Sequence, residues 1–181
     1  VMDNEEVGSG TKQGADSTFL EDVLSRIASA MGKTDSERRA AIAASFMVSA
    51  DNAHAVHPNH PEKYDVGNRT FMNGGVVVKF NANQKYTTDG VSSAIFESIC
   101  ARAGVPVQHF ANRSDVLGGS TLGNIANAHT SMNTVDIGLA QLAMHSSYET
   151  AGCRDLDFMI QALKAFYETD IRALEDGTFE I

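Results

Sequence analysis

The run Val76-Val77-Val78-Lys79-Phe80 constrains the fold of this chain more than any other stretch. Consecutive β-branched residues favour a β-strand, and an apolar run without alternation is typical of a strand that is covered on both faces of its sheet. Lys79 is the exception within the run, because a lysine buried in such a strand needs a reason for its position. The run predicts a central strand that lies between two layers.

Further strand-like runs and helical patterns alternate along the chain. The strand-like runs are Phe46–Val48, Val105–Ala111 and Val135–Leu139, and apolar residues have helical spacing in Phe19–Met31, Val91–Ile99 and Met159–Phe166. The inward face of the helix in 91–99 is expected to hold Val91, Ala94, Ile95, Ser98 and Ile99. This alternation predicts an α/β fold with a largely parallel central sheet. A chain of 181 residues is short for two domains, so residues 1–181 are expected to form a single domain.

Two helix starts carry recognisable capping residues. Thr34 and Glu37 have the spacing of a capping box, in which each side chain bonds to the backbone of the other residue. Asp16 or Ser17 is expected to cap the preceding helix, because both side chains can accept bonds from the free N–H groups of a first turn.

The charge balance excludes some classes of partner. Lysine and arginine together number 14, aspartate and glutamate number 23, and the formal net charge is −9. This balance disfavours nucleic acid or an anionic membrane surface as a partner. No stretch has the pattern of a secretory leader or a membrane-spanning helix, so the cytoplasm is the expected location.

The chain has two cysteines, Cys100 and Cys153, which form neither a C-x-x-C motif nor a disulfide framework. Cysteine is among the residues most often buried in folded proteins. Both are therefore expected to be free, buried thiols in a reducing compartment.

Chemically reactive side chains are concentrated in three segments. Residues 49–60 hold one carboxylate and three imidazoles within twelve positions, and residues 3–9 and 144–149 hold further carboxylates and a histidine. Carboxylate oxygens and imidazole nitrogens are ligands of zinc. No pair has the i, i+4 spacing of a helical zinc site, so these residues alone leave a zinc site and ordinary solvated or packed side chains as open alternatives.

Five blocks of sequence, in this order, resemble the aspartyl aminopeptidase family. They are D-N-E-E-V-G-S at 3–9, S-A-D-N-A-H-A-V-H-P-N-H at 49–60, N-G-G-V-V-V-K-F-N-A-N-Q-K-Y at 73–86, N-R-S-D-V-L-G-G-S-T-L-G at 112–123 and M-H-S at 144–146. The likeness extends from Asp3 to about Phe166. It implies a dinuclear zinc peptidase that removes acidic residues from the N-termini of peptides, and a three-layer α/β/α sandwich with a mostly parallel sheet.

The resemblance also implies roles for individual residues. Glu5 matches the general base and Glu6 a zinc ligand. His145 joins Glu6 on the same metal, and Asp51 binds the other metal. A complete site of this family holds two zinc ions, and other divalent ions remain an alternative. Consecutive side chains point in different directions, so Glu6 can reach a metal while Glu5 holds the attacking water and takes its proton.

Substrate-binding roles are implied for Lys79, Gly118 and Gly119. The alternative for Lys79 is a side chain that extends from the strand end into solvent. His54 and His57 either orient a metal-binding carboxylate or serve as satisfied core or interface histidines, and the sequence leaves both interpretations open.

The family's remaining histidine ligand and its bridging aspartate precede Val1, and its inserted oligomerisation domain is absent. The chain is therefore expected to be the latter part of a catalytic domain, with a sheet incomplete at its N-terminal side, and not a competent peptidase alone. The expected partners are a peptide with an acidic N-terminus and further copies of the chain. The alternative function is a non-catalytic, peptidase-like module for assembly or peptide binding.

Overall fold

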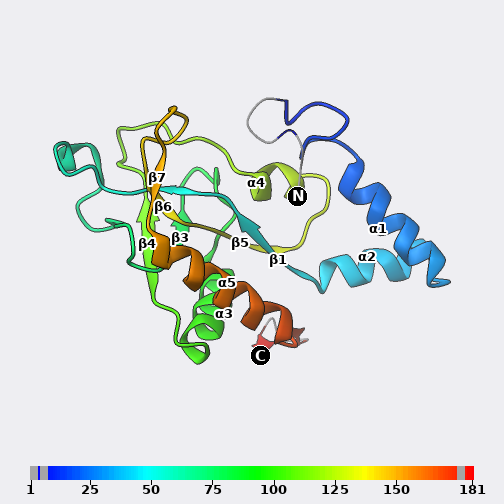
Figure 1. Ribbon diagram of the computed structural model, residues 1–181. Coiled ribbons are helices and arrows are strands. Elements are labelled where there is room, and N and C mark those ends of the chain that lie inside the picture. Colours follow the sequence, from blue (N-terminus) through cyan, green and yellow to red (C-terminus); the bar gives the residue numbers. More distant parts are fainter. Residues whose placement is uncertain (1–3, 5–7, 175–177) are drawn as a thin grey trace.

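The computed structural model describes Asn4, residues 8–174 and residues 178–181 (Figure 1). Its helices are α1 (Phe19–Ala30), α2 (Asp35–Ala43), α3 (Gly90–Arg102), α4 (Leu122–Asn127) and α5 (Cys153–Glu168), with a 3₁₀ turn at Pro61–Lys63. Its strands are β1 (Phe46–Ala50), β2 (Ala53–His54), β3 (Val76–Phe80), β4 (Val107–Ala111), β5 (Asn133–Gly138), β6 (Ala140–Leu142), β7 (Thr150–Ala151), β8 (Arg172–Ala173) and β9 (Phe179–Glu180).

The central sheet has four strands in the order β1-β5-β3-β4. β1 pairs with β5 and β3 pairs with β4 in parallel, whereas β3 and β5 are antiparallel. The predicted strands and the mostly parallel sheet are therefore confirmed. Beyond the central sheet, β2 pairs in parallel with β6, and β7 adds to β6 in the antiparallel direction.

Helices cover both faces of the central sheet, which gives the expected three layers (Figure 1). α3 and α5 cover one face, where Val76, Val78 and Phe96 form part of a buried core. α4 packs on β1 and β5 at the other face, and the N–H of Gly123 donates to Oγ of Ser49 at 2.9 Å. A Cβ at Gly123 would lie 2.6 Å from the Ser49 Cβ, so this close packing requires glycine.

The capping box at α2 is confirmed. The Thr34 hydroxyl accepts from the Glu37 N–H at 3.2 Å, and the Glu37 carboxylate accepts from the Thr34 N–H at 2.8 Å. The prediction for α1 was wrong by one or two residues, because Thr18 holds the N-cap position. Ser17 still accepts from the first N–H of the helix, while the Asp16 carboxylate is bonded to the His129 ring instead.

Two predictions of burial need correction. In α3, Ile95 and Ile99 are buried as expected, but Phe96 shares the inward face. Ala94 and Val91, which were expected there, are exposed, Val91 at 46%. The reason is that α3 contacts both α5 and the sheet, which rotates its buried face by about one residue. Cys100 is buried, whereas Cys153 is exposed.

Cys153 is exposed because it is the first residue of α5, whose buried residues begin two positions later at Asp155. α1 has no buried residue, and its apolar stripe Phe19, Val23, Ile27 and Met31 is exposed. Among the described residues, no helix combines the length and the apolar character needed to cross a membrane.

Candidate active site

A cavity of about 210 Å³ lies at the junction of β1 and β2, and it collects most of the candidate residues that the structure describes. Asp51, His54, Lys79, Gly119 and His145 all line it. They come from four segments that are far apart in the sequence, namely the turn after β1 together with β2, strand β3, the turn before α4 and the turn after β6. The fold therefore brings together side chains from four of the five blocks that resemble the peptidase family.

A larger cavity, of about 550 Å³, lies nearby and is lined by residues such as Asn81, Asn112 and Arg113. In the described part of the chain, its lining includes no carboxylate and no histidine. The smaller cavity is therefore the better candidate for metal-dependent chemistry.

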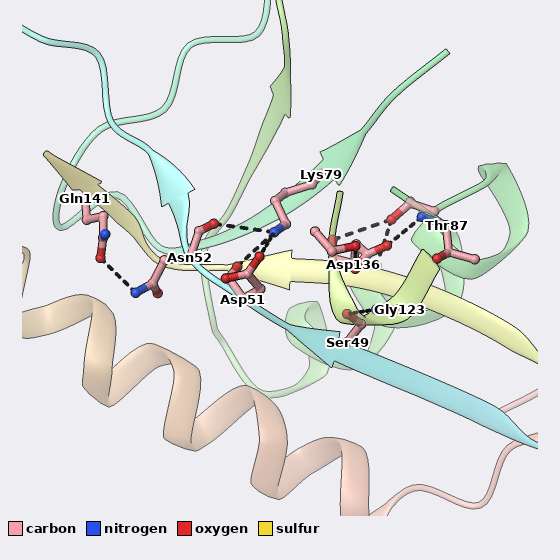
Figure 2. A network of polar contacts seen from close by, with 10 residues as sticks. Ser49, Asp51, Asn52, Lys79, Thr87, Gly123, Asp136 and Gln141 are labelled. Atoms are coloured by element: carbon pink, nitrogen blue, oxygen red, sulfur yellow. Dashed lines mark hydrogen bonds and ion pairs between the residues drawn. The ribbon is translucent and has the colours of Figure 1, made fainter. Parts of the chain in front are cut away.

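The Lys79 side chain crosses from β3 to the turn after β1 (Figure 2). Its ammonium nitrogen lies 3.0 Å from the Asp51 carbonyl oxygen, 3.4 Å from the Asn52 carbonyl oxygen and 3.5 Å from Oδ2 of Asp51. It also lies 5.1 Å from the centre of the Tyr86 ring, within the range of a cation–π contact. Lys79 is 2% exposed, so the alternative of a side chain extended into solvent is wrong.

The Asp51 turn is also held by the end of β5. The Asp51 N–H donates to the Ile137 carbonyl at 2.9 Å. A Cβ at Gly138 would lie 1.9 Å from the Asp51 carbonyl oxygen, so the turn can pass this strand only because residue 138 is glycine. Contacts of the Asp51 backbone with β5 and with Lys79 of β3 thus fix the position of the Asp51 carboxylate at the edge of the sheet.

His54 lies in β2, with its ring centre 6.3 Å from that of Phe110. Partial burial of the imidazole is the largest cause that lowers the pKa of His54, and His145 and Lys79 lower it further, while Asp51 opposes them. The lowered pKa favours the neutral imidazole, which can accept a proton or bind a metal.

His145 follows β6 in a turn with an unusual backbone. Its φ is 67°, in the left-handed region, and Ala143 in the same turn has a φ of 56°. The His145 N–H donates to Oε1 of Glu149 at 2.6 Å. Glu149 belongs to the segment 144–149, which is rich in reactive side chains, but no sequence pattern assigns it this partner.

Two candidate residues lie outside the lining of this cavity in the described structure. Nδ1 of His57 accepts from the Asn59 N–H at 3.2 Å, and its ring centre is 5.3 Å from that of His60. Gly118 faces a neighbouring cavity of about 180 Å³. A Cβ there would lie 1.9 Å from Nδ2 of Asn112, so a larger residue at position 118 would require the Asn112 side chain to move.

Asp136 is a buried carboxylate that sequence reasoning did not select. Its Oδ1 accepts from the Thr121 hydroxyl at 2.8 Å and its Oδ2 from the Thr87 N–H at 2.5 Å (Figure 2). These bonds hold two loops in place, one with Gly119 and the other with Tyr86, and both residues line the cavity. The signal that was available is an aspartate between two β-branched residues of a predicted strand, because a carboxylate buried there needs hydrogen-bond donors.

The described residues supply part of a metal-binding donor set. A carboxylate and imidazoles face one cavity, and these are the atom types that zinc binds. Glu5 and Glu6 lie outside the described residues. Within Asn4, 8–174 and 178–181, no three His, Cys, Asp or Glu side chains form a group that could hold a metal. The donors fit zinc by their chemistry, and a full ligand set needs contributions from beyond these residues.

The sequence is similar to known proteins over most of its length. Residues 1–167 match the family described as aminopeptidase I zinc metalloprotease (M18). A probable M18 family aminopeptidase 2 of Clostridium acetobutylicum is 50% identical over 166 residues, which cover 92% of this chain and 38% of that relative. The chain thus spans about two fifths of the length of this relative.

Solved structures show the same fold. A chain in the cryo-EM structure of the Ape4 and Nbr1 complex superposes with a TM-score of 0.88 at 42% identity, covering 91% of this chain and 31% of that one. The mApe1 dodecamer of S. cerevisiae superposes with a TM-score of 0.78 at 32% identity, covering 90% and 36%.

Proposed function

Because the chain belongs to the M18 family of aminopeptidase I zinc metalloproteases, we propose that it carries part of the active site of an aminopeptidase that removes acidic residues from the N-termini of peptides. The observation that supports this most strongly is the cavity that Asp51, Lys79 and His145 share. A hydrolytic metal site needs ligands, a charged group for the substrate and space for both, and this cavity has candidates for each.

The metal ligands that this chain would contribute are Glu6, Asp51 and His145. Zinc bound there would polarise the peptide carbonyl and lower the pKa of a bound water, and a pair of ions would share these tasks. Glu5 would accept a proton from the attacking water and pass it to the leaving amine. His54 borders the same cavity, and partial burial, His145 and Lys79 lower its pKa, which favours the neutral ring.

Lys79 is the residue that we assign to the selection of acidic substrates. Of its contacts with the Asp51 turn, those at 3.0 and 3.4 Å are to neutral carbonyl groups, and that with the Asp51 carboxylate is longer, at 3.5 Å. If Asp51 binds a metal, the carboxylate charge is shared with that ion. The ammonium group then retains positive charge at the cavity, where a substrate carboxylate can meet it. Gly118 and Gly119 would let the substrate backbone approach the adjacent turn.

Self-association is part of the same proposal. One structural relative is a dodecamer. Here the apolar stripe of α1 is exposed, as are Leu156 and Ile160 on α5. Contiguous apolar surface of this kind is typical of protein–protein contacts. Light scattering coupled to gel filtration tests the proposal, and a strictly monomeric chain at high concentration would contradict it.

A second candidate is a peptidase-like module that binds peptides without turnover. Its supporting observation is the ammonium group of Lys79 at the cavity, which could bind a peptide carboxylate without a metal. Metal analysis of the purified chain after dialysis against buffered zinc separates the two functions. Retained zinc supports the peptidase site, whereas zinc-free protein that still binds an N-terminal aspartyl peptide supports the module.

A further inference from the structure

A chain of polar contacts connects the turn that holds Asp51 to the turn that holds His145. Nδ2 of Asn52 donates to Oε1 of Gln141 at 2.8 Å (Figure 2). Nε2 of Gln141 in turn donates to Oε1 of Glu149 at 3.4 Å. The same Glu149 oxygen accepts from the His145 N–H at 2.6 Å. A continuous path therefore links the neighbour of one proposed ligand to the backbone of another.

Gln141 is well placed to act as the centre of this path. It lies in β6, between β2 and β7, where it pairs with His54 of β2 and with Ala151 of β7. It is 5% exposed, and a buried amide is stable only when both its oxygen and its nitrogen have partners. Its oxygen accepts from Asn52, next to Asp51, and its nitrogen donates to Glu149, which bonds the His145 turn. Rotation of the amide would therefore break both contacts.

The His145 turn needs an external restraint. Two of its residues, Ala143 and His145, have positive φ, which residues other than glycine rarely adopt without surrounding contacts. The bond from the His145 N–H to the Glu149 carboxylate supplies such a contact, and bonds to a charged acceptor are stronger than neutral ones. Backbone strain held by side-chain contacts is frequent where a side chain must be aimed at a site.

We infer that Gln141 and Glu149 are positioning residues that hold the Asp51 and His145 turns at a fixed separation, so that their side chains are preorganised for a metal. The metal part of this inference rests on the proposed function. The coupling of the two turns through Asn52, Gln141 and Glu149 is independent of it. Both are assigned to positioning because the contacts described above are to Asn52, to each other and to the His145 backbone.

The first test compares three variants of the 181-residue chain by amide hydrogen exchange at His145. Glu149→Ala removes the acceptor and should speed exchange about tenfold, the factor that corresponds to a bond to a charged group. Glu149→Gln keeps an oxygen acceptor at the same position and should exchange nearly as slowly as the wild type. Asp157→Ala, which removes an exposed carboxylate from α5, serves as the charge-matched control and should have no effect.

The second test measures coupling between the turns. Asn52→Ala removes the far end of the path, more than ninety residues before His145 in the sequence. If these contacts couple the two turns, Asn52→Ala should also speed amide exchange at His145 by a few-fold. The melting temperature should stay close to that of the wild type. Unchanged exchange at His145 in both Asn52→Ala and Glu149→Ala would overturn the inference.

The third test is the zinc affinity, measured by competition with a chromophoric chelator. Loss of a residue that orients a metal ligand typically weakens binding about 10- to 100-fold, so Glu149→Ala and Gln141→Leu should show this loss and Glu149→Gln should recover most of it. Equal losses in Glu149→Ala and Glu149→Gln would show that charge, not the hydrogen bond, matters, and would overturn the metal part. If the wild type binds no zinc, the proposed function fails, and the exchange experiments decide the coupling alone.

Discussion

The ammonium group of Lys79 lies 3.0 Å from the carbonyl oxygen of Asp51 and 3.5 Å from its carboxylate. The lysine is buried at 2% exposure, whereas the aspartate side chain is 28% exposed and borders the cavity. This pairing explains how a lysine can occupy the central strand β3. The same residue thus contacts the Asp51 turn and places an ammonium group at the cavity.

Lys79→Met should therefore destabilise the protein. The methionine fills a similar volume, but the carbonyl groups of Asp51 and Asn52 lose their donor, at a cost of about 1–3 kcal/mol. Chemical denaturation measures the change. Lys85→Met, at an exposed lysine in a nearby loop, is the control and should be nearly neutral. An equally small effect of both substitutions would show that the buried contacts of Lys79 contribute little.

The same substitution should change substrate preference in a catalytically active form of the protein. Lys79→Met is expected to lower kcat/KM for peptides with N-terminal Asp or Glu far more than for peptides with neutral N-termini, because only the former lose an attractive charge. Steady-state kinetics on matched chromogenic peptides measures this. Equal losses on both substrate types would refute a selective role.

Much of the fold could be predicted from local patterns. The valine run gave β3, the Thr34–Glu37 spacing gave the start of α2, and Ile95 and Ile99 were placed inward correctly. The antiparallel pairing of β3 with β5 could not be predicted, because strand order depends on long-range packing that no local pattern encodes. The exposure of Val91 depends on the same tertiary packing of α3.

Less of the candidate site than of the fold could be predicted from the sequence. Asp51, Lys79 and His145 could be selected because they lie in blocks that resemble a known family. The roles of Asn52, Gln141 and Glu149 could not be predicted, although Asn52 lies in the same block as Asp51, because these roles depend on contacts between segments up to 89 residues apart. An asparagine, a glutamine and a surface glutamate carry no distinguishing signal until the fold brings them together.

The two thiols should differ in reactivity. Burial, and to a smaller extent nearby Glu97, raises the pKa of the Cys100 thiol to about 12, so hardly any thiolate forms at pH 8. Cys153 is exposed at the start of α5. A thiol reagent should modify one cysteine of the native chain quickly and the second only after unfolding. In Cys153→Ser the fast reaction should vanish, and its persistence would contradict the burial of Cys100.

Substitutions of the two neighbouring glutamates should have different effects on the zinc content. Glu5→Gln is expected to keep the zinc content of the wild type, because only the proposed proton acceptor is lost, whereas Glu6→Gln should reduce it. Elemental analysis after dialysis against buffered zinc provides the measurement. If Glu5→Gln empties the site and Glu6→Gln does not, the two roles are assigned the wrong way round.

A zinc titration followed by two-dimensional NMR of the isotope-labelled chain shows whether Asp51 and His145 face a common metal-binding cavity. The resonances of both residues are expected to shift together as zinc is added, and His145→Ala should abolish or strongly weaken the response. Shifts confined to His57 and His60, or a spectrum that zinc leaves unchanged, would contradict it.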